Sequence, residues 1–535
     1  MDKSTNIVSI PKEKFEFVAR GERIKDQKFE DKPIGYFHDA WNRFCKNKAS
    51  IVAAIIILCI VLFAIIVPFF NPANIGTVAN TRYQNKVPRN LTLSKIGILT
   101  GDLEIQYNEK GFANIVGIGI AAGTDFENIP SIGEALANAG ELQPVTKIKS
   151  IEKVMQGRNE KLMYNAMVDD YLQVGFSYED VEQEEYQRML AWQEETGIQL
   201  LYPMIAKNEY NFAESSGDTN TAANWWYKTN SRGEPVRINS QGNAVIIKYD
   251  DINDLVLEDN YQRDADGNLV YFNYVGGGTQ ETAMYRVRTL YYNYYRYTHE
   301  GREPEFFFGT DTSGYDMAYR LAIGIRLSLL LAVCIFAINF IIGAMYGAVE
   351  GYYGGNVDLV LEFISYVLSG VPFIVVATLF QIHLAAKAGA IPSLLFAFVL
   401  TGWIGTASLV RTQFYRFKNQ EYVMAARTLG ARDRRVIWKH IFPNTLGTII
   451  TASVLAIPSV IFSESMLSYL GIVSLGSPTQ TSVGTLLSNA EKLWTTYPHL
   501  MLFPAAVISL LMICFNLFGN GLRDAFNPSL RGVEE

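Results

Sequence analysis

The chain has 535 residues, with 46 Lys and Arg against 53 Asp and Glu, and a formal net charge of −7. This length exceeds what one hydrophobic core usually holds, so we expect two or three units. A mean hydropathy of +0.08 excludes a chain that lies wholly in a membrane, and the clustering of the apolar residues excludes an ordinary soluble protein.

The N-terminal tail is charged and mixed in sign, which predicts loose order. Residues 34–48 place Phe37, Trp41 and Phe44 near helical spacing, with basic residues toward the following apolar segment. This pattern predicts an amphipathic elbow helix on the inner membrane surface, with an unstructured basic flank as the alternative. We expect residues 1–50 to be cytoplasmic.

Six apolar stretches lack Asp, Glu, Lys and Arg for about twenty residues or more, the length that a helix needs to cross a bilayer. The first has no small-residue cleavage site after it, so we interpret it as a retained anchor rather than a signal peptide. The stretches are 51–70, 327–349, 363–386, 388–410, 441–463 and 497–520.

Residues 71–305 form a polar insert between the first two stretches. They hold 33 acidic and 21 basic side chains, a formal charge of −12 that leaves +5 for the rest of the chain. Acidic helical patterns at about 145–200 and β-rich runs at about 236–275 predict a mixed α+β domain. The tyrosine-rich run 290–297 is interpreted as a strand, and Asp264–Asn268 as a plain turn rather than a calcium loop.

The basic loop at 411–440 fixes the expected topology. Eight Lys or Arg lie between Arg411 and Lys439 against two acidic residues, and short basic loops stay in the cytoplasm. The loop, the N-terminus and a tail at 521–535 are therefore expected inside, and the insert outside. The four cysteines lie in or beside the spans, so the outer domain has no disulfide.

Motifs for catalysis are missing from the sequence. There is no glycine-rich loop ending in Gly-Lys-Ser/Thr, no Ser/His/Asp set, and no metal spacing among the five histidines. We therefore expect no catalytic residue, no metal site, no cofactor and no nucleic acid, and predict that the chain is not an enzyme.

A short helix is expected inside the basic loop. Ala425, Ala426 and Gly430 recur at helical spacing, which keeps one side of the helix thin enough to seat in a groove of another protein. Gly430 can close this helix in a left-handed cap.

Five further stretches have a distinctive order and spacing: Gly309–Asp316, Gly351–Asp358, the loop after Glu421, Glu464–Gly471 and Asn516–Pro528. Together they resemble the oligopeptide and dipeptide permeases of ATP-binding-cassette importers, in the C-type branch. The match covers about residues 34–70 and 306–531, and departs from the family pattern at Met424, where Glu is usual, and at Tyr315, where Arg is usual.

The resemblance implies a six-span, mainly α-helical importer permease, with a core at 306–520 and the large extracytoplasmic α+β insert. It implies a heterodimer with a second permease, two ATPase subunits that bind ATP and Mg, an extracellular peptide-binding lipoprotein and a peptide substrate, all at the cell membrane. The residues implied to couple to the ATPase subunits are Glu421, Tyr422, Met424, Ala425, Ala426, Arg427 and Gly430; the pathway or gate candidates are Asp311, Glu464, Ser465 and Asn516.

Three functions stay open at this point: a peptide importer, the same scaffold importing another solute such as nickel or opines, and a membrane-anchored outer enzyme or sensor. A sensor has no need of the thin Ala-Ala-Gly helix. For the insert, docking of the binding protein or partner permease is preferred over a lid or a solubilising role.

Overall fold

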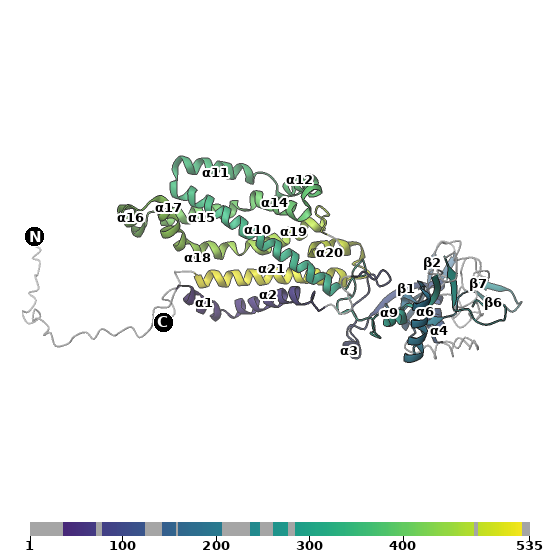
Figure 1. The fold of residues 1–535 in the computed structure, drawn as a ribbon. Helices are drawn as coiled ribbons and strands as arrows, with labels where there is room; N and C mark the ends of the chain where they lie inside the picture. The colour runs from purple at the N-terminus through teal and green to yellow at the C-terminus, as the bar shows by residue number, and fades with distance from the viewer. Residues whose placement is uncertain are drawn as a thin grey trace, which may run out of the picture.

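The computed structural model divides into a long helical body and an α/β insert at one end of it (Figure 1). The predicted tail at 1–33 lies outside the described residues, as do residues 527–535 of the tail predicted at 521–535, whereas residues 521–526 continue α21. The structure describes residues 36–70, 78–123, 142–156, 159–205, 236–246, 261–276, 284–475 and 480–526.

The helices of the body begin with the predicted elbow helix and its anchor. The elbow helix is confirmed: Phe44 packs edge-on against Phe518, with ring centroids 5.3 Å apart, while Trp41 is exposed. The helices are α1 Tyr36–Lys46, α2 Lys48–Ile66, α10 Met317–Tyr353, α11 Gly355–Ser369, α12 Phe373–His383, α13 Ala385–Ala388, α14 Ala390–Gly402, α15 Ile404–Phe417, α16 Glu421–Thr428, α17 Asp433–Arg435, the π-helical segment η7 Val436–Ile441, α18 Phe442–Ser453, α19 Ala456–Tyr469, α20 Val483–Ala490, the 3-10 turn η8 Glu491–Leu493 and α21 His499–Phe526.

Five helical runs among the described residues are long and apolar enough to cross a membrane, and a bent pair makes a sixth. The bent pair is α11 and α12, which meet at 73°. The break falls at Gly370–Pro372, because proline lacks the N–H that a continuous helix needs at this point. The predicted stretch at 363–386 is therefore broken, while the other five lie within or largely within helical runs.

Glycines let α10 approach α15 closely. A side chain at Gly347 would meet the carbonyl oxygen of Ala407, and one at Gly351 would meet Arg411 and Phe414. Glycines repeated every fourth residue leave a groove along a helix, and this permits close backbone contact inside a membrane. The backbones of α10 and α15 therefore pack closely against each other along the body.

The described part of the insert contains three antiparallel sheets. The first has the order β1-β3-β2, the second centres on β9 with β4 on one side and β5 and β8 on the other, and the third pairs β6 with β7. The elements are α3 Leu91–Ser94, β1 Asp102–Asn108, α4 Glu109–Gly123, β2 Val145–Gln156, β3 Asn159–Asp169, η4 Leu172–Val174, β4 Phe176–Val181, α6 Gln183–Thr196, β5 Leu201–Tyr202, β6 Val236–Ile238, β7 Ala244–Ile246, β8 Phe272–Val275, β9 Met284–Leu290 and α9 Tyr291–Thr298.

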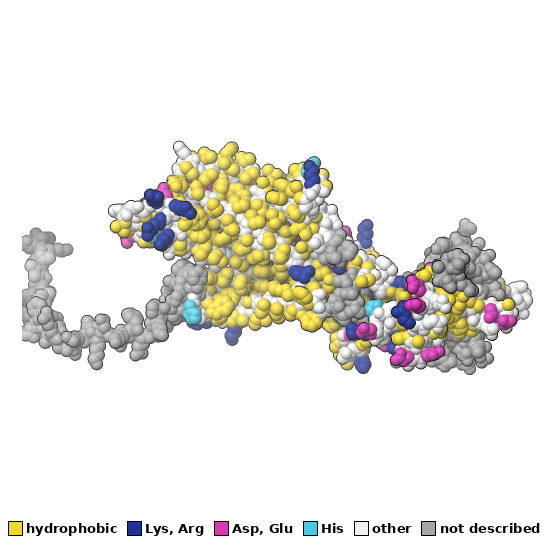
Figure 2. All heavy atoms as spheres, in the orientation of Figure 1, with side chains coloured by type: hydrophobic (Ala, Val, Ile, Leu, Met, Phe, Trp, Pro, Cys, Tyr) yellow, Lys and Arg dark blue, Asp and Glu magenta, His cyan; other side chains and the backbone are white. Residues whose placement is uncertain are grey.

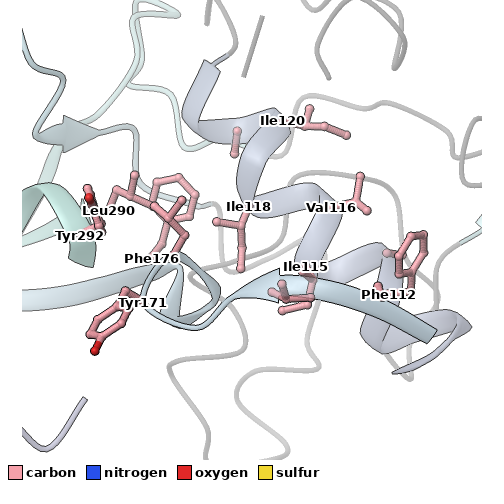
Figure 3. Close-up of a cluster of buried hydrophobic side chains, with 14 of the residues drawn as sticks. Phe112, Ile115, Val116, Ile118, Ile120, Tyr171, Phe176, Leu290 and Tyr292 are labelled. Carbon is pink, nitrogen blue, oxygen red and sulfur yellow. The ribbon is translucent and has the colours of Figure 1, made fainter. Parts of the chain in front are cut away.

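An apolar core joins α4 to the two larger sheets. Ile115 and Ile118 of α4 lie over the strand beneath them, and Phe176, Leu290 and Tyr292 gather beside it (Figure 3). Burial of large apolar side chains is the main source of stability in a domain without disulfides. The insert thus has a core of its own, as its length predicted.

Two predictions about the insert are wrong. The run at 290–297 is a helix after Leu290, because its tyrosines recur at three- and four-residue spacing rather than in alternation. The segment at 145–169 is a β-hairpin rather than a helix, and register shifts in β2 hide its alternation. The turn at Asp264 is confirmed: its carboxylate accepts the N–H groups of Asp266 and Asn268.

The insert is tied to the N-terminal end of α10 by a buried junction. Lys86 Nζ lies 2.9 Å from Asp170 Oδ1, and both side chains are almost completely buried. Asp170 also accepts the N–H of Val87, and Thr310 accepts the N–H of Lys86. The two partners of this desolvated ion pair both belong to the insert, so the pair holds Lys86 against the sheets. The bond from the Lys86 N–H to Thr310 then joins the insert to the segment that precedes α10.

Candidate functional site

The seven predicted coupling residues lie together on α16 and its cap, at the end of the body opposite the insert (Figure 1). Gly430 has φ of +79°, and its N–H donates to the carbonyl of Arg427 over 2.9 Å. Ala431 N–H donates to the carbonyl of Ala426. These bonds form the predicted left-handed cap, which ends the helix and turns the chain toward α17.

One face of α16 is fixed to the helical body. Val423 is fully buried in a cluster with Val436 and Ile441 from the following segment and Phe414 from α15. The Arg427 guanidinium lies 5.0 Å from the ring centre of Tyr352 at the end of α10. Any displacement of α16 would therefore act directly on the three helical segments that it contacts, α10, α15 and η7.

The other face of α16 is exposed. Tyr422 and Met424 are 39% and 54% exposed, and Leu429 is 89% exposed. Exposed large apolar side chains grouped on one short helix are typical of a protein contact surface. Glu421, Ala425 and Arg427 are also exposed, and Ala426 is half-buried.

A charged cluster that the sequence analysis missed holds the helices that lead into α16. Arg411 on α15 donates to both carboxylate oxygens of Asp358 on α11, at 2.6 and 2.8 Å, and also to Glu362. Tyr415 donates to Asp358 over 2.6 Å, and Lys418 donates to the carbonyl of Gly351 over 2.9 Å. The charges stand at the ends of predicted spans, but nothing in a single sequence pairs residues 53 positions apart.

The four pathway candidates do not form one cluster. Asp311 lies just before the N-terminal end of α10, where it pairs with Arg320 at 3.3 Å and accepts the N–H groups of Ser313 and Tyr315. It lines a cavity of about 10 Å³, which has room for about one water molecule. Asn516 lies on α21, is exposed, and donates to its own helix at Met512.

Glu464 and Ser465 are buried neighbours on α19. Glu464 is 1% exposed and accepts hydrogen bonds from Ser328 on α10 and from Ser468, at 2.9 and 3.0 Å. This carboxyl thus faces protein side chains rather than lipid, where an unpaired charge would be costly. Gly484 of α20 packs directly against the backbone of Ser465.

Within the described parts of the chain, no group of three or more His, Cys, Asp and Glu is placed to hold a metal ion. All four cysteines are free thiols.

Two segments of the chain, one on each side of the insert, match known protein families. Residues 340–532 match the binding-protein-dependent transport system inner membrane component, and residues 35–88 match the N-terminal TM domain of oligopeptide transport permease C. Over 225 residues, 42% of this chain and 72% of the relative, the chain is 39% identical to the oligopeptide transport system permease protein OppC of Bacillus subtilis. The chain belongs to this family of peptide transport permeases.

Other relatives agree. The permease is 40% identical to the dipeptide transport system permease protein DppC of Bacillus subtilis over 42% of this chain and 69% of the relative. A solved structure of the inward-facing MetNI methionine ABC transporter aligns with 39% of this permease and 98% of its own chain, at 14% identity and a TM-score of 0.34. The permease is thus a membrane component of a peptide ABC importer and not an enzyme.

Proposed function

We propose that this permease forms half of the translocation pathway of an ATP-driven oligopeptide importer. A second permease supplies the other half, two ATPase subunits bind ATP and Mg, and an extracellular peptide-binding lipoprotein delivers the peptide. The cavity beside Asp311 is far too small for a peptide. A path between two permeases, rather than through one, accounts for this.

The observation that carries the proposal is the mounting of α16. Its exposed Tyr422, Met424 and Leu429 offer a surface to an ATPase subunit, while Val423 and Arg427 hold it to the body. ATP-driven closure of the ATPase subunits would move α16 and rock the spans between inward-open and outward-open states.

Peptides are the favoured solute because the relatives at 32–40% identity carry oligopeptide or dipeptide transport in their names. Dipeptides, nickel and opines are the alternatives on the same scaffold. Transport competition separates them: unlabelled di- to hexapeptides should reduce uptake of a labelled peptide, and nickel should not. Competition by nickel alone would reject the peptide assignment.

The test of coupling is assembly. The full permease should copurify with its partner permease and two ATPase subunits, and Leu429→Asp should weaken that copurification because it puts a charge into an apolar contact. Ile96→Asp, at an exposed apolar side chain of the insert, is the matched control. Equal ATPase recovery in both variants would contradict the role of α16.

For orientation, we propose that α16 and the ends of the chain lie in the cytoplasm and that the insert is extracellular. The insert and α16 stand at opposite ends of the body (Figure 1), and the loop at 411–440 is basic. A cysteine introduced at Thr428 should react with membrane-impermeant maleimide only in opened cells, and one at Asp266 in intact cells. Labelling of Thr428→Cys in intact cells would reverse the topology.

We propose that the insert docks the binding protein, since its buried junction with α10 gives it a fixed position at the pathway entrance. The test deletes residues 90–300 together with Lys86→Met, because the deletion removes Asp170 and would leave Lys86 buried without its partner. Stimulation of ATPase activity by the binding protein should fall. Unchanged stimulation would reject docking.

A further inference from the structure

A basic cleft lies beside α16, where the chain enters α18. It has a volume of about 530 Å³ and is lined by Arg432, Arg434, Arg435, Trp438 and Lys439. Four cations and no acidic side chain line it. Within the part of the chain that the structure describes, none of these four cations has an ion-pair partner.

The floor of the cleft is the π-helical segment η7, Val436–Ile441. Pro443, just inside α18, has no N–H to give to a helical carbonyl, and Asn444 Nδ2 donates to the carbonyl of His440 over 2.7 Å. Single π turns of this kind are frequent at functional sites. Here the turn presents Trp438 and Lys439 on the exposed side, while Val436 and Ile437 stay buried.

The position of the cleft points to a membrane surface. Lys and Arg side chains gather at the α16–α17 end of the body, directly beside its broad apolar surface (Figure 2). Trp438 is 41% exposed and its ring packs 5.0 Å from Phe442. Exposed tryptophan next to Lys and Arg at the end of a span is typical of the membrane–water interface, where lipid headgroups lie.

We propose that this cleft binds the phosphate of an anionic phospholipid headgroup. Arginine forks suit phosphate oxygens, and basic pockets beside spans bind such headgroups. An acidic ATPase surface is the rival occupant, but the aromatic residue and the adjacent apolar surface fit a lipid with an acyl chain. Which leaflet supplies the lipid depends on the orientation proposed above. The chemistry by which the cleft recognises the headgroup does not depend on it.

The experiment titrates the full-length permease in detergent with phosphatidylglycerol and with phosphatidylcholine, and counts bound lipids by native mass spectrometry. Wild type should retain one phosphatidylglycerol in preference to phosphatidylcholine. Each cation near an anionic headgroup contributes about fivefold, so Arg434→Gln/Arg435→Gln should weaken that binding about 25-fold. Lys439→Gln, a milder change, should weaken it about fivefold.

Arg416→Gln is the matched control, since Arg416 is an exposed cation of the same basic loop that does not line the cleft. It should leave phosphatidylglycerol binding unchanged. Equal binding by all variants, or equal weakening by Arg416→Gln, would overturn the proposal. Two further results would also overturn it. One is displacement of the lipid by millimolar inorganic phosphate. The other is an Arg434→Gln/Arg435→Gln variant that binds the lipid as wild type does but loses the ATPase subunits.

Discussion

The two ends of the helical body are held by charges in different ways. At the insert end, Lys86 and Asp170 are sealed from water, with side chains 8% and 0% exposed. At the α16 end, Arg411 is 23% exposed and shares its charge among three carboxylates, of which Glu362 is 51% exposed. One end is closed and the other is open to solvent.

This difference has a mechanical meaning. A desolvated pair cannot separate without a large cost, so the insert end behaves as a fixed mount. In the Arg411 cluster, the Glu350 and Asp358 side chains are only 4% and 10% exposed, but Glu362 is 51% exposed, so water can replace the Arg411–Glu362 contact at small cost. The α16 end is thus suited to movement, and the following variants test that contrast from the largest effect to the smallest.

Asp170→Ala should have the largest effect. It leaves Lys86 buried without a counter-charge and removes the acceptor of the Val87 N–H, a loss of about 3–5 kcal/mol in unfolding free energy. Thermal unfolding of the full permease in detergent measures it. Lys86→Met/Asp170→Leu should recover part of the loss, and an Asp170→Ala chain as stable as wild type would refute the fixed mount.

Arg411→Ala should cost less, about 2 kcal/mol, because Arg411 itself is 23% exposed and Glu362, one of its partners, is 51% exposed. Its main effect should be on peptide uptake, since Asp358, Glu362 and Glu350 then repel one another beside the helices that lead into α16. Arg411→Lys keeps the charge but not the fork, so its uptake should be intermediate. Wild-type uptake by Arg411→Ala would show that the cluster is not needed for transport.

The sequence predicted those parts of the candidate site whose pattern lies within one short segment. The α16 helix and its Gly430 cap follow from small-residue spacing and the need for positive φ at its end. The pairing of Arg411 with Asp358 and of Lys86 with Asp170 joins distant segments. Periodicity within a segment carries no information on such contacts.

Gly430→Val and Gly267→Val form a matched pair across the two regions. Both glycines have positive φ, +79° and +86°, and at neither would a Cβ meet another atom within 4 Å. Each substitution should cost about 1–2 kcal/mol through backbone strain alone. Only Gly430→Val should abolish uptake at normal expression, since it alone alters the turn after α16; equal uptake by the two variants would remove the coupling role of this cap.

The fold was predictable for the spans and less so for the insert. A charge-free run of twenty residues has few structural options in lipid, so five predicted stretches correspond to helices. Even there, a Gly and a Pro within 363–386 break the helix. In the insert, β2 carries register shifts that disturb its alternation, and the tyrosines of α9 were assigned to a strand although their spacing is helical.

The smallest effect is expected at an exposed ion pair of the insert. Arg286 donates to both oxygens of Asp180 across β9 and β4, at 2.7 and 2.8 Å, and this bonding lowers the pKa of Asp180. A carboxylate with a lowered pKa stabilises the fold above its unfolded pKa, and the contribution disappears as pH falls through the folded value. Asp180→Asn should therefore lower stability by a few tenths to about 1 kcal/mol at neutral pH, and the difference should shrink as pH falls below about 3.9, the unfolded pKa, and vanish below the folded pKa, as followed by thermal unfolding. Because the pair is exposed, added salt should shrink the neutral-pH difference, and a difference that grew on acidification would mean that Asp180 is not held by Arg286.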